Sequence, residues 1–281
     1  MLRTLPMLID THCHINMMVK STFDTPLQKS DLPQARTIIE DAHAHNVNII
    51  INVGTRSVEN ENCILLARTF DQVFATVGIH PNDSDTWQED FELLKKWTRS
   101  IQENKIVGIG ECGIDMHYPD YNLHRQRDAF KAQIELALEH DLALVVHSRD
   151  AYDETLRILE EYKNNLSRVT MHCFSYDTAF AQTVTEWNFV LGIGGTITYP
   201  KNEELRNIVK NTELKNIVLE TDAPFLPPQA IRGKQNHPKE IAAIAQYIAD
   251  LRGETLEVIA QATTHNALKL FGITKELHEI L

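Results

Sequence analysis

Residues 9–14 read Ile-Asp-Thr-His-Cys-His and place two histidines, one residue apart, at the end of an apolar run near the start of the chain. Side chains alternate between the two faces of a β-strand, so His12 and His14 point the same way and Cys13 points the other way. If this run is the first strand of a closed barrel, both imidazoles project into its interior at the C-terminal mouth, where such barrels carry out chemistry. The segment therefore predicts a metal site, with a pair of unrelated histidines as the alternative.

Short β-branched runs recur along the chain, with amphipathic stretches between them, which is typical of repeated strand and helix units. The pattern predicts eight strands, at residues 8–14, 47–53, 73–80, 106–112, 142–147, 169–173, 189–194 and 217–222. Helices are expected between them at 31–46, 58–70, 87–104, 123–140, 152–165, 178–187 and 202–212, and after the eighth strand at 239–252, 255–262 and 264–271.

A chain of 281 residues suits one closed barrel, which typically needs about 250 residues. No linker, solenoid repeat or low-complexity segment divides residues 1–281. We therefore expect a single α/β domain, an eight-stranded TIM-type (β/α)8 barrel with extra C-terminal helices. A doubly wound open sheet is the alternative, but the first strand lacks the Gly-rich phosphate turn of its dinucleotide-binding form.

The formal charge of −12 at pH 7 argues against a broad basic surface for nucleic acid. It leaves phosphodiester chemistry open, because a metal-lined mouth needs only a few local cations. The sequence has no run of about 18 apolar residues and no secretory signal at its start, so we expect a cytoplasmic protein with no membrane partner. Cys13, Cys112 and Cys173 each follow a candidate ligand, and on a strand they would face away from it as small hydrophobic residues.

Residues of metal-binding type stand at the C-terminal ends of the predicted strands. Beside His12 and His14 on the first strand, these are Glu111 on the fourth, His147 on the fifth, His172 on the sixth and Asp222 on the eighth. Two imidazoles and two carboxylates can hold one divalent ion, and two more imidazoles sharing a carboxylate can hold a second. Glu111 is the expected bridge, since a carboxylate has two oxygens and its strand lies between the two groups. Each residue alone could be a solvated or capping residue, but the set predicts two divalent ions of Zn, Mg, Mn, Co or Ni.

Two further carboxylates share a strand face with these residues, Asp10 with His12 and Glu220 with Asp222. Each could hydrogen-bond an imidazole from behind, or could be a buried, paired carboxylate of the barrel core. Glycines at 192, 194 and 195 leave the seventh strand end without side chains. This suits the close approach of substrate or backbone, or a tight turn.

Substrate contacts are expected at the same mouth. His80 ends the third strand but exceeds the number of ligands that two ions need, so we expect it to contact a substrate phosphate or the leaving group. Arg149 lies two residues beyond a candidate ligand and can bind a phosphate with two hydrogen bonds, unless it pairs with a neighbouring aspartate at the helix start. A long Pro-rich loop, 223–238, carries two more candidate cations, Arg232 and Lys234.

Six segments resemble the signature segments of the TatD-type metal-dependent deoxyribonucleases. They are 10–14 (Asp-Thr-His-Cys-His), 78–81 (Gly-Ile-His-Pro), 110–115 (Gly-Glu-Cys-Gly-Ile-Asp), 147–151 (His-Ser-Arg-Asp-Ala), 172–174 (His-Cys-Phe) and 220–224 (Glu-Thr-Asp-Ala-Pro). The resemblance covers about residues 7–272 and implies a TIM-type barrel of the amidohydrolase kind with two divalent metals and 3′ to 5′ exonuclease activity. It also implies one ion at His12, His14, Glu111 and Asp222, and the other at Glu111, His147 and His172.

We therefore expect a deoxyribonuclease that acts on DNA chain ends, single-stranded or nicked, through a metal-bound hydroxide. Glu111 and Asp222 would be catalytic, with Asp222 as ligand and proton acceptor. The same centre could hydrolyse an ester or amide, as in a D-aminoacyl-tRNA deacylase, and a silent binding protein is a third possibility that the full ligand set argues against. Nothing in the sequence indicates an obligate protein partner.

Overall fold

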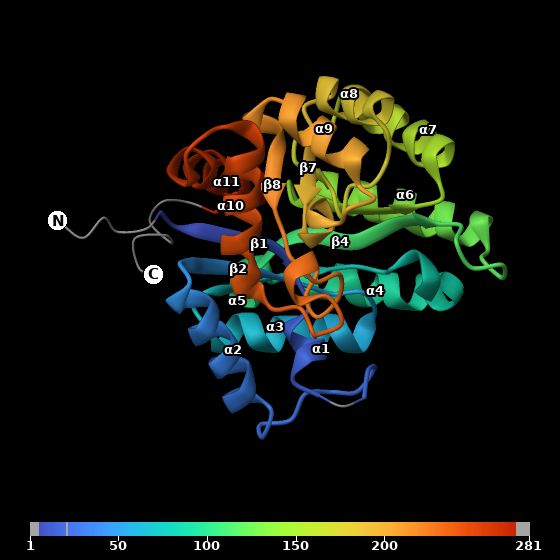
Figure 1. Cartoon of the computed structure of the whole chain (residues 1–281). Helices are drawn as coiled ribbons and strands as arrows, with labels where there is room; N and C mark the ends of the chain where they lie inside the picture. The colour runs from blue at the N-terminus through green and yellow to red at the C-terminus, as the bar shows by residue number, and fades with distance from the viewer. Residues whose placement is uncertain (1–5, 21, 274–281) are drawn as a thin grey trace.

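The computed structural model describes residues 6–20 and 22–273. Eight parallel strands follow one another in chain order around a nearly closed barrel, and helices surround it (Figure 1). The strands are β1 (Leu8–Cys13), β2 (Val47–Val53), β3 (Val73–Val77), β4 (Ile106–Asp115), β5 (Ala143–Arg149), β6 (Val169–Met171), β7 (Val190–Ile193) and β8 (Ile217–Leu219). This order confirms the TIM-type barrel and rules out the doubly wound sheet, whose strand order reverses at a switch point.

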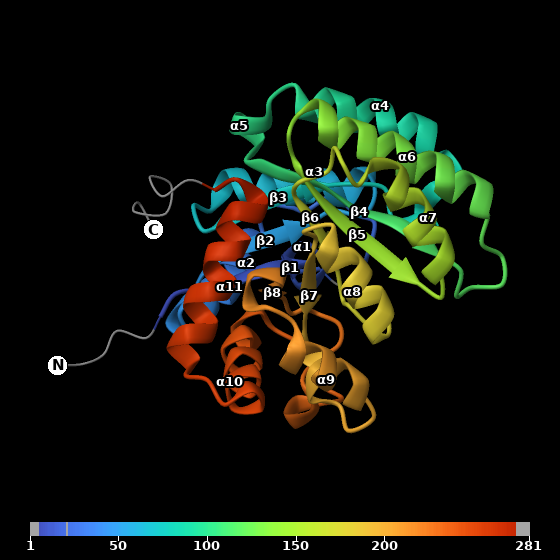
Figure 2. The same ribbon diagram turned by 90° about the horizontal axis from the view of Figure 1, so that it is seen from above.

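The longer helices are α2 (Leu32–Ala44), α3 (Ser57–Thr69), α4 (Trp87–Thr98), α6 (Leu123–Glu139), α7 (Tyr152–Tyr162), α8 (Thr178–Glu186), α9 (Glu203–Asn211), α10 (Ile241–Arg252) and α11 (Leu256–Phe271). Short turns of helix are α1 (Ile15–Met18), α5 (Ile101–Asn104), η1 (Pro81–Thr86), η2 (Gly195–Thr198), η3 (Leu214–Asn216), η4 (Gln229–Ile231) and η5 (Pro238–Glu240). Seen from above, α4, α6 and α7 cover one flank of the barrel and α10 and α11 the opposite one (Figure 2).

The strands are buried on both faces, which explains their continuous apolar runs. In β2, for example, Ile50 packs outward with the helix-facing core, whereas Ile49 and Ile51 belong to a second cluster. This second cluster draws on most strands and on Leu270 and Phe271 at the end of α11. It fills the barrel interior and closes its floor, so polar side chains are left for the opposite end of the interior, the mouth.

The barrel closes between the two ends of the chain. Here the strand ladder is reduced to one parallel bridge, between Cys13 and Ala223. The Asp222 N–H donates to the His12 carbonyl at 2.8 Å, and the His14 N–H donates to the Ala223 carbonyl at 2.7 Å. The closure of the barrel therefore brings the histidine pair beside Asp222.

Asp10 strengthens this seam with hydrogen bonds from its side chain. Its carboxylate accepts hydrogen bonds from the Thr221 N–H at 3.0 Å, the Thr221 hydroxyl at 2.6 Å and the His12 N–H at 3.2 Å. Of the two roles that the sequence left open for Asp10, the structure thus gives the paired core carboxylate.

Several strand ends differ from those expected, because β1, β3 and β8 stop before the polar residue that was expected to end them, and β6 stops at Met171 rather than Cys173. The residues left beyond the strands are His14, His80, His172 and Asp222. Their backbone N–H groups bond to other segments of the mouth, as the His80 N–H does to the Thr55 carbonyl at 2.7 Å. β5, in contrast, runs on to Arg149, opposite Asp115 of β4.

Two helix predictions were also wrong. The expected helix at 87–104 is interrupted after Thr98, whose hydroxyl bonds back to the Leu94 carbonyl. The two helices expected at 255–262 and 264–271 form a single helix, α11, because the Thr263 hydroxyl is satisfied inside it by the Ile259 carbonyl and no Gly or Pro intervenes.

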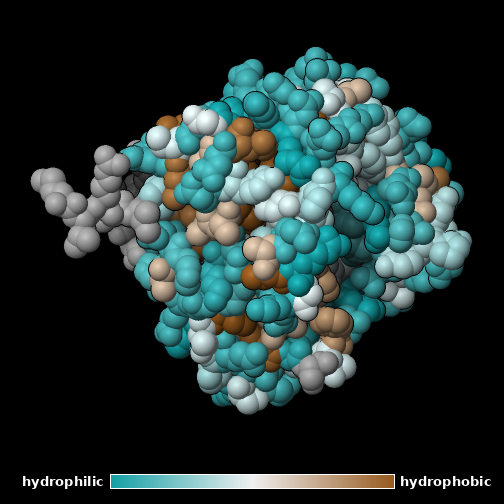
Figure 3. Space-filling model, viewed as in Figure 1, coloured by the Kyte–Doolittle hydropathy of each residue, from teal (hydrophilic) through white to brown (hydrophobic). Residues whose placement is uncertain are grey.

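In the described part of the chain, no helix combines the length and apolar character needed to cross a membrane. On the face shown in Figure 3, hydrophobic residues form small patches separated by hydrophilic ones.

One buried carboxylate anchors the loop that follows α1 at the edge of the mouth. Glu59 of α3 is fully buried and accepts hydrogen bonds from the Lys20 ammonium at 2.6 Å, the Asp24 N–H at 2.8 Å and the Asn16 amide at 2.8 Å. Burial by itself raises the pKa of Glu59, but the hydrogen bonds from Lys20 and Asn16 outweigh it and lower the pKa below its ordinary value of 4.5.

We predict that Glu59→Gln lowers the free energy of unfolding at pH 7 by about 3 kcal/mol, because it leaves the buried Lys20 ammonium without its counter-charge. Since the folded-state pKa is depressed, the stabilisation is complete above the unfolded-state pKa near 4.5 and is lost as the pH falls through the lower folded-state value. The difference in the free energy of unfolding between wild type and Glu59→Gln should therefore decrease below pH 4.5.

Urea denaturation at several pH values measures this effect. The matched control is Glu92→Gln, which removes the exposed partner of Lys95 and should change stability by roughly 0.5 kcal/mol or less. Equal effects of the two substitutions would contradict the anchoring role of Glu59.

Candidate metal centre

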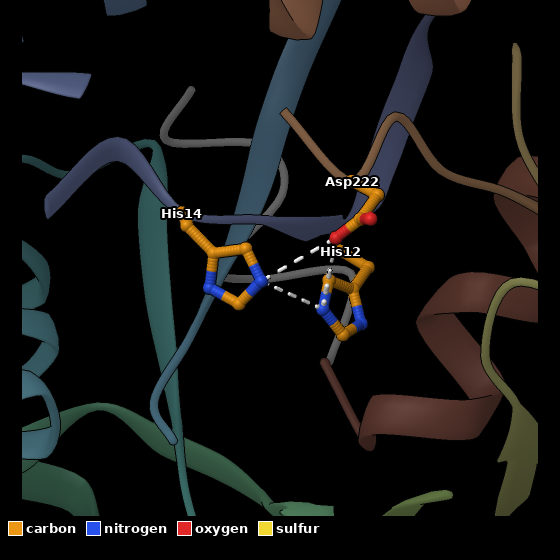
Figure 4. Close-up of side chains that lie close together, drawn as sticks. All are labelled: His12, His14 and Asp222. Carbon is orange, nitrogen blue, oxygen red and sulfur yellow. Dashed lines mark hydrogen bonds and ion pairs between the residues drawn. The ribbon is translucent and has the colours of Figure 1, made fainter. Parts of the chain in front are cut away.

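Four of the predicted ligand atoms meet at the mouth side of β1, β4 and β8. His12 Nε2 and His14 Nε2 lie 3.1 Å apart, and Asp222 Oδ1 lies 3.7 Å and 3.4 Å from them, respectively (Figure 4). Glu111 Oε2 completes the group at 3.4 Å from His12 Nε2 and 3.9 Å from His14 Nε2. Figure 4 shows that both imidazoles turn their Nε2 atoms toward the aspartate carboxylate.

These spacings fit a shared divalent ion. Ligands bound at about 2.1 Å around a tetrahedral ion lie about 3.4 Å from one another, and the distances of the two histidine nitrogens from each other and from the two carboxylate oxygens, 3.1 to 3.9 Å, bracket that value. Two neutral imidazole nitrogens and two carboxylate oxygens are also the donor types that Zn and similar transition metals accept. The group therefore has the spacing and chemistry of a metal site.

The second oxygen of Glu111 faces a different group of imidazoles. Oε1 lies 2.7 Å from His147 Nδ1, 3.7 Å from His172 Nε2 and 3.8 Å from His80 Nε2. The ring of His172 stacks on that of His12, with centroids 3.5 Å apart, so the two groups are contiguous. The carboxylate thus lies between two clusters of nitrogen atoms, one at each oxygen.

Contacts on the far side of the rings orient two of the imidazoles. His14 Nδ1 lies 2.8 Å from the Val53 carbonyl, so it carries the proton and leaves Nε2 with a free lone pair. His172 Nδ1 lies 3.0 Å from Glu220 Oε1, in keeping with one of the two roles that the sequence left open for Glu220. Gly192 makes room for this carboxylate, since a Cβ there would lie 2.3 Å from Glu220 Oε2.

Asp115 is a residue of this centre that the sequence analysis missed. Its carboxylate is buried, and Oδ2 lies 3.1 Å from His147 Nε2 and accepts a hydrogen bond from the Asn82 amide at 3.1 Å. It orients His147 so that Nδ1 faces Glu111. Strand alternation offered a signal, because residues 111, 113 and 115 share one face of β4.

Electrostatics keep the two central carboxylates ionised. Burial raises the pKa of Glu111, but the imidazoles of His172, His12 and His147 outweigh it and hold the pKa well below its ordinary value. Burial likewise opposes ionisation of Asp222, and the neighbouring histidines, His14 first, lower its pKa overall. Both groups are therefore in the anionic form that binds cations near neutral pH.

A cavity of about 640 Å³ opens over the cluster. Of the predicted substrate contacts, His80 and Arg149 line it, and Arg149 lies over the Tyr118 ring, 5.8 Å from its centroid, rather than pairing with a neighbouring aspartate. Arg232 and Lys234 do not line this cavity; the Arg232 guanidinium instead lies over the ring of Tyr199 at 4.3 Å. The role of these two cations in substrate binding stays a prediction.

Two other residues of the cavity were misjudged. Arg56, which follows β2, lines it and pairs with Asp24 and Asp83, yet the end of the second strand was given no role. Cys173 was expected to face away as a small hydrophobic residue, but it lines the cavity. The expectation failed because β6 ends at Met171 and Cys173 has a φ of 46°, so strand alternation does not apply there. Cys13 and Cys112 are buried in the outer core, as expected.

Comparisons of this chain with known proteins agree on one protein family. The model of the TatD related DNase family matches residues 9–272. The chain is 34% identical over 268 residues to an uncharacterized metal-dependent hydrolase of Bacillus subtilis, YabD, and the match covers 95% of this chain and 100% of the relative. It is 32% identical over 242 residues to a 3′-5′ ssDNA/RNA exonuclease, TatD, of Citrobacter rodentium, covering 84% of this chain and 91% of that protein.

Solved structures agree. The crystal structure of YJJV, a TatD homologue from Escherichia coli, superposes with a TM-score of 0.86 at 27% identity and covers 96% of this chain and 100% of the other. The resemblance inferred from six short segments is thus confirmed along nearly the whole chain. This protein belongs to the TatD-related DNase family and is a metal-dependent hydrolase.

Proposed function

We propose that this protein is a two-metal phosphodiesterase that removes nucleotides from the 3′ ends of DNA. The observation that carries the proposal is the position of Glu111, whose two oxygens face two separate groups of imidazole nitrogens at 2.7 to 3.9 Å. Two ions about 3.5 to 4 Å apart, held by a shared carboxylate, are typical of enzymes that displace an oxygen at phosphorus. The exonuclease similar to this chain supports nucleic acid as the substrate.

In this proposal His12, His14, Glu111 and Asp222 hold one ion, and Glu111, His147 and His172 hold the other. When bound, such ions lower the pKa of a coordinated water toward about 7 and neutralise the charge that develops on phosphorus. The sulfur of Cys173 is outside both sets.

Asp222 is the proposed proton acceptor. Its Oδ1 faces the histidines, whereas Oδ2 has no hydrogen-bond or ion-pair partner among the described residues. The side chain also lines the cavity and is more exposed than Glu111, with 14% against 6% of its surface accessible. One free oxygen at the edge of the cavity can accept a proton from an attacking water.

His80 is proposed to contact a phosphate oxygen or the leaving group. Its Nδ1 accepts a hydrogen bond from the Asn82 N–H at 3.1 Å, so the neutral ring carries its proton on Nε2. Burial lowers the pKa of His80 to about 3, which keeps the ring neutral. Nε2–H is thus a hydrogen-bond donor beside Glu111, where a substrate oxygen would lie.

We predict that protein loaded with Zn, Mn, Co, Ni or Mg degrades end-labelled single-stranded DNA from its 3′ end and that a chelator abolishes this activity. Gel analysis of 3′- and 5′-labelled strands, of nicked duplex and of charged D-aminoacyl-tRNA measures both substrate and polarity. Deacylation of the tRNA without cleavage of DNA would replace the proposal with the ester-hydrolase alternative. Failure to bind any metal would favour a silent binding protein.

Metal content tests the bridge separately. Glu111→Gln should weaken both ions, because a neutral amide cannot neutralise two cations, whereas His12→Ala should chiefly weaken one. Elemental analysis after dialysis should find up to two ions per chain in wild type, less than one in Glu111→Gln and about one in His12→Ala. The exposed His45→Ala serves as control, circular dichroism checks folding, and wild-type metal content in Glu111→Gln would rule out bridging.

Arg149 is predicted to bind a substrate phosphate, because it lines the cavity and no acidic side chain in the described part of the chain pairs with it. Arg149→Met should raise the KM for single-stranded DNA about tenfold and reduce the slope of log(kcat/KM) against log salt by about 0.7, the value for one phosphate contact. Arg232→Met, outside the cavity, is the matched comparison and should change KM less. If Arg149→Met equals wild type at every salt concentration, Arg149 is structural.

A further inference from the structure

The exposed aromatic residues of this protein gather in the loops of the mouth. Among the described residues, the large hydrophobic side chains that remain exposed are Phe23, Leu65, Tyr118, Tyr121, Phe225 and Val258. The two aliphatic ones lie on the outer helices α3 and α11. All four aromatic ones lie in loops that follow β1, β4 and β8 at the C-terminal side of the barrel.

Phe225 lies beside a candidate ligand of the metal centre. Its ring centroid lies 6.1 Å from that of His14, and the side chain lines the cavity although 43% of the residue is exposed. Phe23 lines the same cavity and is 54% exposed. Exposed apolar rings cost free energy in water, so two of them in one catalytic cavity call for a ligand that covers them.

The backbone under Phe225 is held in place. Its N–H donates to the Asp222 carbonyl at 2.7 Å, and its carbonyl accepts from the amide of the fully buried Asn236 at 2.7 Å. The same amide also donates to the Thr221 carbonyl at 2.7 Å. The ring is therefore presented from a rigid loop that also carries Asp222, and no reorganisation is needed to use it.

The charges around the two rings indicate what covers them. Arg149 lines the same cavity without an ion-pair partner among the described residues, and Arg56 lines it while paired with Asp24 and Asp83, on a chain whose formal charge is −12. Cations interleaved with exposed aromatic rings are the pattern that binds single-stranded nucleic acid, in which phosphates pair with the cations and base faces stack on the rings. A small neutral ester has no phosphate charge to pair with the cations and no base to stack on the rings.

We propose that Phe225, with Phe23 in the same cavity, forms a stacking subsite for the unpaired bases beside the scissile phosphate. The substrate class, a nucleic acid, rests on the proposed function. The stacking subsite is the part of the cavity that would recognise unpaired bases of that substrate. A base inside a duplex has both faces covered by its neighbours, and the terminal base of a blunt end shows only its outer face and is held in its pair, whereas a frayed or single-stranded end is free to turn its bases onto Phe225. The subsite thus makes the enzyme select unpaired ends.

Binding and turnover together test this subsite in the full-length, metal-loaded protein. The variants are Phe225→Ala, Phe225→Trp and, as a control that removes a similarly exposed apolar side chain outside the mouth, Leu65→Ala. The binding probe is a short single-stranded DNA with phosphorothioate linkages and 2-aminopurine at its 3′ end, whose fluorescence is quenched by stacking. Steady-state kinetics on single-stranded and blunt duplex DNA give KM and kcat.

Phe225→Ala should weaken binding and raise the KM for single-stranded DNA about 5- to 150-fold, the effect of losing one base–aromatic stack, and should abolish the quenching. Phe225→Trp should retain both, and Leu65→Ala should match wild type. An oligonucleotide with an abasic 3′ end should bind wild type and Phe225→Ala equally.

Wild-type binding and quenching in Phe225→Ala would overturn the subsite even if DNA is the substrate. If wild type cleaves no nucleic acid, the proposed function fails, and the quenching experiment still decides whether the rings stack on bases. Equal preference of wild type and Phe225→Ala for single-stranded over duplex DNA would overturn the selection of unpaired ends.

Discussion

The mouth of this barrel depends on the position of Glu111, which lies where three strands converge. Its backbone N–H donates to the Gly54 carbonyl at the end of β2, across the end of β3. The segment around Glu111 can pass this close to the end of β3 only because residue 78 is a glycine. A Cβ at Gly78 would lie 2.6 Å from the Gly110 Cα. The convergence turns the carboxylate to the centre of the barrel, where each oxygen reaches a different set of imidazoles. His147 and His172 can then share a ligand with the distant pair on β1.

The centre is costly to a protein without metal. Among the described residues, several buried polar atoms there have no hydrogen-bond partner, including His12 Nδ1 and Glu220 Oε2. Burial lowers the pKa of His12, whereas the carboxylates of Glu220 and Glu111 outweigh burial and raise the pKa of His172 to about 10. Buried polar groups left unpaired cost stability, and a fold keeps them where function requires them. Divalent cations are the natural compensation, since they bind the carboxylates and displace imidazole protons.

The residues around the metal centre occupy a different part of the fold from the candidate ligands. The ligand-type residues lie in the strands or within three residues of their ends, where backbone hydrogen bonds hold the chain, whereas Phe23, Arg56 and Phe225 lie in the loops between strand and helix. Barrels of this kind vary their loops while keeping one catalytic centre, so hydrolase chemistry follows from the strand ends and substrate choice from the loops. In this protein Arg149 at the end of β5 and Arg56 in a loop supply cations, and the loops supply aromatic rings, which supports the proposed nucleic acid substrate.

The sequence by itself determined the strand and helix rhythm, the barrel and the residue types of the metal centre, because burial periodicity and ligand chemistry are local properties. It could not determine which of its equally charged residues face the cavity. Arg149 lines the cavity and Arg232 does not, although the sequence made both of them candidate substrate contacts. Arg56 and Cys173 were missed or misjudged for the same reason, since their directions depend on where each backbone leaves its strand. Asp115 was missed because β4 runs three residues further than expected. Only the tertiary structure decided that His12 meets Asp222, because the two belong to opposite ends of the chain and come together through the seam that closes the barrel.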